Sequence, residues 1–498
     1  MMKKLRPIML GGTGSDVGKS VLAAGLCRIF LQDGYHPAPF KAQNMALNSY
    51  VTPDGLEIGR AQAVQAEAAG VECMPEMNPV LLKPSGNMTS QVVLNGLPVG
   101  NKDAYEYFRK ENKEPLRKEV HAAFDRLSSR YNPIVMEGAG SIAELNLRDS
   151  DIVNMSMARY AGAAVILVAD IDRGGVFASA YGSIMLQTEV DRRYIKGIIV
   201  NKFRGDEKLF EKGRRQMEEI CGVPVIGVVP YLDDIHIEEE DSVSLMKKSS
   251  VHTEENMINV AVLALPHISN FTDFDTISRD PRVHLYFTDD PSELGKGDVI
   301  ILPGSKNTIG DLRAMREKGC DDAVIAAAAR GCSVMGICGG YQMMGREISD
   351  PDGVEGEVAA AEGLCLLPTS TVLRGNKTIR RVEFTVKDCE VTGSGYEIHM
   401  GETEVPADAS PLVVKSDGTC DGCIAGDRVM GSYIHGILDN QEVTDRLLAP
   451  HARAKGLPLK SETEPYRSYK ERQYDALSAR LRECLDIELL YKIMREDD

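Results

Sequence analysis

The sequence predicts an α/β protein with two doubly wound parallel-sheet domains, and three observations favour this fold class. Apolar runs of four to eight residues alternate with longer amphipathic stretches, which is the pattern of parallel strands joined by crossover helices. A glycine-rich segment follows an apolar run near the start of the chain, and another follows an apolar run in the second half. The 498 residues are also too many for one core and suit two domains.

Each half contains several runs that we expect to be parallel strands. They are Ile134–Met136, Ala164–Ala169, Ile198–Val200 and Val225–Val229 in the first half, and INVAVLAL from Ile258, Asp298–Leu302 and Ser333–Ile337 in the second. Residues 237–256 between them are acidic and polar, which is typical of a linker. We therefore predict domains at residues 1–236 and 257–498, joined by a linker at 237–256.

Composition and charge limit the possible partners. The chain is 43% hydrophobic and 26% charged, and its longest apolar stretch, Ala161–Ala169, has about half the length needed to cross a bilayer. The opening MMKKLRPIML has no hydrophobic core of secretory type, so we expect a cytoplasmic protein without membrane contact. The net charge of -17 disfavours a nucleic acid partner, and any anionic substrate requires a local positive pocket.

The segment GTGSDVGKS, which follows the apolar run Pro7–Leu10, predicts a phosphate-binding loop. It is one residue longer than the common P-loop but keeps its chemistry: backbone N–H groups face phosphates, Lys19 neutralises them, and Ser20 can bind Mg²⁺. A glycine turn between strand and helix is the structural alternative. The predicted ATP-binding residues are Gly12, Thr13, Gly14, Ser15, Asp16, Val17, Gly18, Lys19 and Ser20, with Asn201 added as a candidate for base recognition at a strand end.

A carboxylate at the end of another predicted strand fits the same site. In VMEGAGS, Glu137 lies at a strand end before glycines, where it can reach the loop's magnesium ion directly or through water. The alternative is a carboxylate that only caps a helix. For Asn201 the alternative is a plain strand-end turn. We expect Ser20 and Glu137 to be the metal-binding residues.

The second glycine-rich segment, GICGGYQMMG from Gly336, predicts a nucleophile elbow. A G-x-C-x-G turn between strand and helix places Cys338 at a helix N-terminus, where the thiolate is favoured. The backbone N–H groups of Gly339 and of Gly304, in PGSKNT, are candidates for an oxyanion hole. The motif GSYIHG offers His435 as the base, after the nucleophile in chain order. A buried, inert cysteine and a structural histidine are the alternatives.

Together these residues resemble a known combination. The first half resembles P-loop enzymes of the dethiobiotin synthetase type, and the second resembles class I, triad-type glutamine amidotransferases, whose elbow commonly reads G-x-C-x-G-x-Q and here ends in Gln342. The whole chain resembles the cobyric acid synthase family of cobalamin biosynthesis. The resemblance rests on KAQNMALNS from Lys41, GLEIGRAQAVQAEAAG from Gly55, NPVLLKPSG from Asn78, ADIDRGGVFAS from Ala169, NKFRGD from Asn201, HISNFTDFD from His267 and GYEIHMGET from Gly395.

The resemblance implies a P-loop NTPase-like synthetase domain followed by a flavodoxin-like amidotransferase domain. It also implies ATP-dependent and Mg²⁺-dependent amidation of the b, d, e and g carboxylates of adenosylcobyrinic acid a,c-diamide to adenosylcobyric acid. The nitrogen would come from glutamine through a cysteine thioester, and the acid would be activated as an acyl phosphate. The expected partners are the corrin substrate and glutamine, and the oligomeric state is left open.

The resemblance also assigns roles to particular residues. It places Lys41 near phosphate and the substrate carboxylate, Gln342 near glutamine, and the loop residues Asp170, Asp172 and Arg173 towards the nucleotide or corrin. The DIDRGG turn has a structural alternative, because its carboxylates can also hold the turn itself. The wider amidotransferase class often has glutamate two residues after the histidine, but this chain has Ile437 at that position. Either another group orients His435 or the site works as a dyad, so the third triad member is unassigned.

Two other functions stay open from sequence alone. The first is cobyrinic acid a,c-diamide synthase, which amidates the a and c carboxylates of the same ring and would share both sites. The second, from another class, is a P-loop partition-type ATPase switch with a non-catalytic C-terminal module. The elbow cysteine would have no purpose in such a switch.

Overall fold

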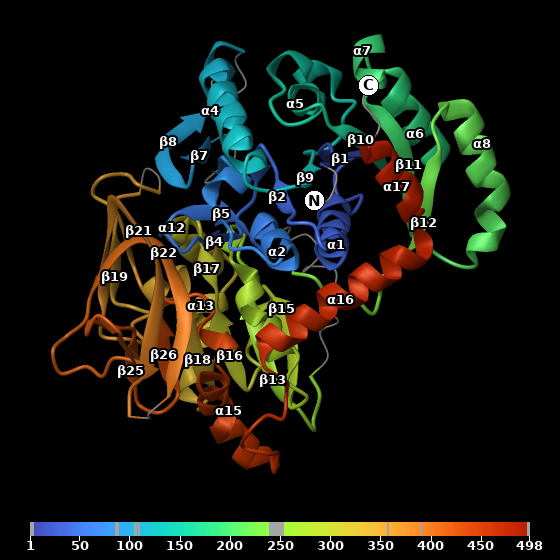
Figure 1. The fold of residues 1–498 in the computed structure, drawn as a ribbon. Helices are drawn as coiled ribbons and strands as arrows, with labels where there is room; N and C mark the ends of the chain where they lie inside the picture. The colour runs from blue at the N-terminus through green and yellow to red at the C-terminus, as the bar shows by residue number, and fades with distance from the viewer. Residues whose placement is uncertain are drawn as a thin grey trace.

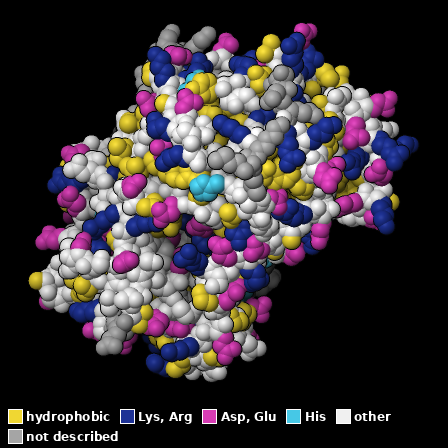
Figure 2. All heavy atoms as spheres, viewed as in Figure 1, with side chains coloured by type: hydrophobic (Ala, Val, Ile, Leu, Met, Phe, Trp, Pro, Cys, Tyr) yellow, Lys and Arg dark blue, Asp and Glu magenta, His cyan; other side chains and the backbone are white. Residues whose placement is uncertain are grey.

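A computed structural model describes residues 4–84, 89–103, 107, 110–238, 253–355, 358–388 and 391–495. Two six-stranded sheets organise the fold, one in the upper part of Figure 1 and one in the lower left. On the face shown in Figure 2, Lys and Arg side chains are interspersed with Asp and Glu. The prediction of two α/β domains built on parallel sheets is confirmed.

The first sheet has the strand order β12-β11-β10-β1-β9-β2, and all its pairs are parallel. Its strands are β1 (Ile8–Gly12), β2 (Ala38–Phe40), β9 (Ile134–Glu137), β10 (Ala164–Asp170), β11 (Ile195–Phe203) and β12 (Val225–Pro230). The helices around it are α1 (Lys19–Gln32), α2 (Arg60–Ala68), α4 (Lys110–Ser128), α5 (Met155–Ala161), α6 (Val176–Met185), α7 (Glu189–Arg192) and α8 (Glu211–Cys221), with 3-10 turns η2 (Leu145–Ser150) and η3 (Glu207–Phe210). All seven residues of β10 are buried, as expected for a strand covered on both faces.

A smaller layer is inserted between β2 and β9. It consists of the four-stranded sheet β3 (Gln43–Met45), β6 (Val80–Pro84), β7 (Thr89–Leu94) and β8 (Leu97–Asp103), the pair β4 (Ser49–Val51) and β5 (Glu57–Gly59), and the turn η1 (Pro75–Met77). Strand β4 contacts two strands of the second domain, β21 and β22. The insertion therefore forms part of the contact between domains.

The second sheet has the order β15-β13-β16-β18-β26-β25 and is parallel except for β25 at its edge. Its strands are β13 (Ile258–Leu263), β15 (Val283–Thr288), β16 (Val299–Leu302), β18 (Ser333–Ile337), β25 (Cys423–Ala425) and β26 (Val429–Ser432). Around it lie α10 (Asp275–Ser278), α11 (Pro291–Leu294), α12 (Thr308–Glu317), α13 (Cys320–Ala329), α14 (Gly339–Met343), α15 (Gln441–Lys455), η4 (Phe271–Phe274), η5 (Ile437–Asp439) and the pair β14 (Ile268–Ser269) and β17 (Gly304–Ser305).

A third, largely antiparallel sheet flanks the second domain. It contains β19 (Glu347–Ser349), β20 (Ala360–Glu362), β21 (Ser370–Val386), β22 (Thr392–Glu404), β23 (Val413–Lys415) and β24 (Cys420–Asp421). The long hairpin β21–β22 reaches towards the first domain (Figure 1). No sequence pattern predicted this sheet.

The last two helices, α16 (Tyr466–Cys484) and α17 (Ile487–Arg495), leave the second domain and pack on the first (Figure 1). Leu477, Leu481 and Leu490 are buried in the same cluster as the apolar side chains of α1. A Cβ atom at Gly25 would lie 2.3 Å from Leu481 Cδ1, so glycine at this position lets α16 approach α1. The last two helices therefore lie against the first domain, and the domain bounds 1–236 and 257–498 stay a prediction.

The seven predicted strands all occur, with ends that differ by at most a few residues. The proposed linker at 237–256 lies mostly outside the described residues, which stop at 238 and resume at 253. Among the described helices, none is both long enough and apolar enough to span a membrane.

Candidate active sites

The phosphate-binding loop connects β1 to α1, as predicted. Gly18 has φ 95°, and a Cβ atom there would lie 2.2 Å from Asn201 Nδ2, so both the backbone and the space require glycine. Lys19 Nζ donates to the carbonyl oxygens of Gly14 and Gly140, each at 2.9 Å. The ammonium group is thereby held between the loop and the segment after β9, where phosphates would be met.

Glu137, at the end of β9, accepts hydrogen bonds from three side chains. Ser20 Oγ and Lys41 Nζ each donate to Oε1 at 2.9 Å, and Gln65 Nε2 donates to Oε2 at 2.7 Å. Burial alone would raise the pKa of Glu137, but the Lys41 charge and these hydrogen bonds outweigh it and lower the pKa. The carboxylate is therefore an anion beside the Ser20 hydroxyl, and oxygen atoms of this kind are the ligands that Mg²⁺ prefers.

These groups border a cavity of about 960 Å³. The predicted residues that line it are Ser15, Asp16, Gly18, Lys19, Ser20, Lys41, Glu137, Arg173 and Asn201. Lys113, Arg148 and Arg159 line it too and were not predicted. Arg148 and Arg159 are charges outside any motif, so only the fold brings them to the loop. The lining also contains acidic side chains, among them Glu144, Asp151 and Asp191, so its cations are matched by nearly as many carboxylates. The local positive pocket for an anionic substrate stays a prediction.

Three predicted nucleotide-site residues, Asn201, Asp170 and Asp172, make hydrogen bonds within the protein. Asn201 Nδ2 donates to the Val17 carbonyl at 2.8 Å, so this side chain stabilises the phosphate-binding loop. Asp170 accepts from Lys202 Nζ at 3.0 Å, and Asp172 accepts from Arg204 at 2.8 Å. The lining of the cavity contains neither aspartate, but it contains Arg173. The roles predicted for these residues towards nucleotide or corrin stay predictions.

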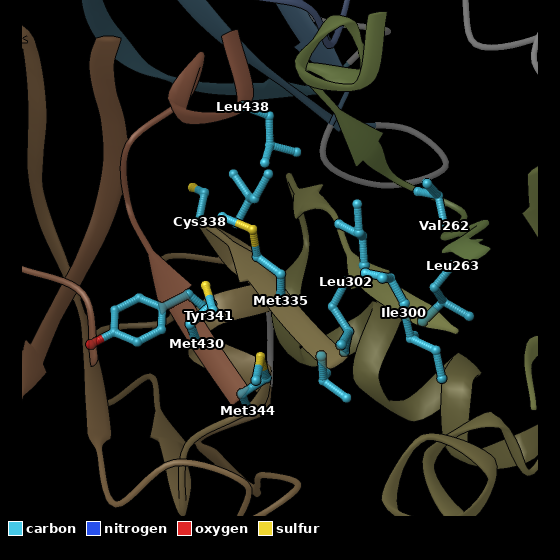
Figure 3. Packing of buried hydrophobic residues seen from close by; sticks show 14 of the residues in the cluster. Val262, Leu263, Ile300, Leu302, Met335, Cys338, Tyr341, Met344, Met430 and Leu438 are labelled. Atoms are coloured by element: carbon cyan, nitrogen blue, oxygen red, sulfur yellow. The ribbon is translucent and has the colours of Figure 1, made fainter. Parts of the chain in front are cut away.

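The predicted elbow follows β18 at the carboxyl end of the second sheet (Figure 3). Cys338 has φ 51° and ψ −109°, a backbone conformation that is rare for residues other than glycine and is typical of strained nucleophile turns. A Cβ atom at Gly340 would lie 2.0 Å from the Leu302 carbonyl oxygen, so the turn can pack on β16 only with glycine there. Cys338 is 6% exposed, and its Sγ lies 3.6 Å from the Ile398 carbonyl oxygen.

The structure assigns the missing third triad member to Asp273. Its Oδ2 lies 2.7 Å from His435 Nδ1, and its Oδ1 accepts the backbone N–H of Gly436 at 2.9 Å. Burial alone would lower the pKa of His435, but the Asp273 carboxylate and the nearby Cys338 outweigh it and raise the pKa to about 10. His435 Nε2 is buried and has no hydrogen-bond partner among the described residues, so it is available for a proton from the thiol.

The predicted oxyanion and glutamine residues gather around this triad. A Cβ atom at Gly304 would lie 3.2 Å from His435 Cε1, and one at Gly339 would lie 2.8 Å from the Ser305 nitrogen. The loops after β16 and β18 are therefore in contact, as the oxyanion-hole prediction requires. Gln342 accepts from Thr308 Oγ1 and donates to the Tyr433 hydroxyl, both at 3.1 Å.

One acidic residue beside this site was missed by sequence reasoning. Glu355 accepts the backbone N–H of Thr308 at 2.6 Å, next to Gln342. Burial raises the pKa of Glu355 to about 7, although the charge of Lys306 opposes the shift. Glu355 lies in a loop without a motif, so no sequence pattern could have identified it.

A phosphate-binding loop in one domain and a Cys–His–Asp triad in the other define an ATP-dependent, glutamine-hydrolysing ligase. The family model described as "CobQ/CobB/MinD/ParA nucleotide binding domain" matches residues 8–245, and the "CobB/CobQ-like glutamine amidotransferase domain" model matches 259–443. Cobyric acid synthases from Phocaeicola vulgatus and Bacteroides fragilis are 62% and 60% identical over all of both chains, and that of Photorhabdus laumondii is 48% identical over 98% of each. The chain belongs to the cobyric acid synthase family.

Proposed function

We propose that the chain amidates the b, d, e and g carboxylates of adenosylcobyrinic acid a,c-diamide to give adenosylcobyric acid, with ATP, Mg²⁺ and glutamine. The observation that carries the proposal is the pairing of the Ser20–Glu137–Lys41 cluster with the Cys338–His435–Asp273 triad in one chain. The names of the full-length relatives support this substrate. A biosynthetic enzyme of this kind, without a membrane-spanning helix among the described residues, fits the cytoplasm.

In the glutaminase half, Cys338 Sγ attacks the amide carbon of glutamine, and His435 Nε2 holds the proton of the thiol, as its raised pKa favours. Asp273 holds the imidazole so that Nε2 faces the reaction and stabilises its positive charge. The C–N bond then breaks, and His435 returns the proton to the departing ammonia. Water hydrolyses the thioester, which releases glutamate and restores the thiol. The N–H of Gly339 stabilises the oxyanion in both steps.

In the synthetase half, an oxygen of the corrin carboxylate attacks the γ-phosphorus of ATP, and ADP leaves. Lys19 and the loop N–H groups stabilise the charge on the phosphates. Ser20 and Glu137 would hold Mg²⁺, which neutralises phosphate charge when bound. Ammonia attacks the carbon of the acyl phosphate, phosphate leaves, and an amide remains.

Ammonia must pass between the halves without protonation, because ammonium is not a nucleophile. The domain interface contains a buried ionic cluster that supports such sheltered transfer. Glu57 accepts from Lys83 Nζ at 2.8 Å and from Lys377 of the second domain, and both Glu57 and Lys83 are at most 3% exposed. Burial would raise the pKa of Glu57, but the Lys377 and Lys83 charges outweigh it and hold the pKa well below its ordinary value. Bulk water is excluded where this cluster lies.

The test is mass spectrometry of the corrin after incubation with ATP, Mg²⁺ and glutamine labelled with ¹⁵N in its amide. We expect four labelled amides on the a,c-diamide substrate. Conversion of cobyrinic acid to its a,c-diamide, with no further amidation, would instead support the a,c-diamide synthase alternative. ATP hydrolysis without any amide product would support a switch protein.

A further inference from the structure

Two hydrogen bonds join the domains beside the triad acid. The backbone N–H of Ser49 donates to Asn270 Oδ1 at 2.9 Å, and the backbone N–H of Phe271 donates to Asn48 Oδ1 at 3.2 Å. All four residues are at most 4% exposed. Because a buried amide that loses its acceptor costs free energy, this reciprocal pair fixes one segment relative to the other.

The joined segment of the second domain carries Asp273. Asn270 has a left-handed backbone conformation with φ 52°, and its carbonyl oxygen accepts the Asp273 N–H at 3.0 Å where η4 begins. Asp273 in turn holds the His435 ring and the Gly436 N–H. A displacement of Asn270 and Phe271 would therefore move the carboxylate that orients the histidine.

A second link from the first domain reaches His435 through Tyr396 of β22. The Tyr396 ring stacks on the His435 ring with centroids 5.3 Å apart, and the two backbones exchange hydrogen bonds of 3.1 and 2.9 Å. The Tyr396 hydroxyl donates to the Ser49 carbonyl at 3.4 Å, and its ring meets Tyr50 edge-on at 4.9 Å. The imidazole thus contacts Asp273 and Tyr396. Tyr396 touches residues 49 and 50 directly, whereas Asp273 is linked to residues 48 and 49 through Asn270 and Phe271.

The same stretch of the first domain leads to the nucleotide site. Lys41, seven positions before Asn48, donates to Glu137. Strand β4, which starts at Ser49, pairs with β5, and α2 follows directly and carries Gln65 to Glu137. Residues 41–51 therefore connect the carboxylate of one active site to the triad of the other.

From these contacts we infer that Asn48 and Ser49 of the first domain position the glutaminase triad of the second, through Asp273 and Tyr396. Glutamine hydrolysis then depends on how the two domains are seated against each other. The inference rests on the proposed glutaminase role of Cys338 and His435. Asn48 and Ser49 are positioning residues, because they act on the triad only through other side chains.

The test compares Asn48→Ala with Asn48→Asp in the full chain. Loss of the acceptor for the Phe271 N–H should lower kcat for glutamine hydrolysis by about 100-fold, since small misplacements of catalytic groups have effects of this size. KM for glutamine should change little, and synthesis driven by high ammonium should be retained. Asn48→Asp keeps an acceptor oxygen and should recover most of the lost kcat.

A spectroscopic measurement separates positioning from a general structural defect. In protein labelled with ¹³C-histidine, the pKa of His435 should fall in Asn48→Ala, because the displaced Asp273 carboxylate no longer stabilises the imidazolium. If Asn48→Ala does not fold, Asn270→Gly takes its place. Glycine accepts the left-handed backbone at this position and removes the acceptor for the Ser49 N–H.

Each outcome decides the inference. Glutaminase kcat near the wild-type value in the folded variant would overturn it, and so would an equal loss of ammonium-driven synthesis or an unchanged His435 titration. Wild-type enzyme and Cys338→Ala are assayed alongside. If wild type shows no glutaminase activity that depends on Cys338, the proposed function has failed rather than this inference.

Discussion

The two active sites differ in how far their charged groups are buried and paired. In the glutaminase site, Cys338, His435 and Asp273 are at most 6% exposed, and the acid–base pair is fixed by two hydrogen bonds. In the synthetase site, the loop opens onto a cavity of about 960 Å³ with several Lys and Arg side chains in its lining. A buried charge must be paired, whereas a large cavity lined by charges of both signs has room for a charged ligand. This difference fits the proposed function, in which one site receives a single small amide and the other a nucleotide together with a large polycarboxylate.

The largest effect should come from Cys338→Ala, because it removes the glutaminase nucleophile and leaves the synthetase site intact. We expect glutamine-dependent synthesis to fall by at least about 10⁴-fold, since no other nucleophile lies at the elbow. Synthesis from high ammonium should continue. Product formation from both nitrogen sources is measured by mass spectrometry, with the exposed Cys420→Ala as control. Loss of both activities would contradict a two-site design.

Asp273→Asn should have the second largest effect. An amide at this position can donate to His435 Nδ1 and so stabilise the tautomer that carries its proton on Nε2. In that tautomer Nε2 cannot accept a proton, so His435 cannot act as a base. We expect kcat for glutamine hydrolysis to fall by about 10³- to 10⁴-fold. Ammonium-driven synthesis should not change, and the exposed Asp408→Asn should behave as wild type. Steady-state glutaminase kinetics give the answer, and a rate near that of wild type would remove Asp273 from the triad.

Lys19→Ala should disable the synthetase site and leave the glutaminase site intact. The cation between Gly14 and Gly140 is lost, so phosphate charge is no longer neutralised. We expect synthesis to fall by about 10²- to 10³-fold with either glutamine or ammonium. Glutamine hydrolysis assayed alone should persist, and Lys212→Ala on exposed α8 serves as control. Synthesis from ammonium at the normal rate would rule out the phosphate role.

The local motifs could be predicted because the chemistry and the geometry lie in adjacent residues. Gly18, Lys19 and Ser20 form one loop, and Cys338 and Gly339 form one turn, so their spacing alone places the groups. Asp273 could not be found in this way, because it is 162 positions from His435 in sequence. The segment HISNFTDFD carries part of the family resemblance, but the role of its aspartate is apparent only when the fold brings η4 to the histidine.

The last helices illustrate a second limit of sequence reasoning. The side chains of α16 and α17 show that they have an apolar face, but amphipathic character does not reveal which sheet covers it. The choice depends on complementary shape, such as the space that Gly25 leaves for Leu481. Asn201 shows the same limit for a polar side chain, since the sequence did not reveal that its amide donates to the Val17 carbonyl. Its contact with a base stays a prediction.

The smallest expected effect concerns stability, and it tests whether the glutaminase site is as tightly paired as its burial indicates. The pKa of His435 is raised to about 10 in the folded protein, against about 6.5 for an unfolded chain. The unfolded state therefore binds fewer protons between these values, so the stability from the His435–Asp273 pair is complete below about pH 6.5 and is lost as pH rises to about 10. Asp273→Asn should lower the free energy of unfolding by about 3 kcal/mol at pH 6 and by much less at pH 10. Urea unfolding of both proteins at the two pH values gives the difference, in which groups common to both cancel. A difference that does not depend on pH would mean that the pair is not ionic, and the glutaminase site would then differ less from the open synthetase site than its geometry indicates.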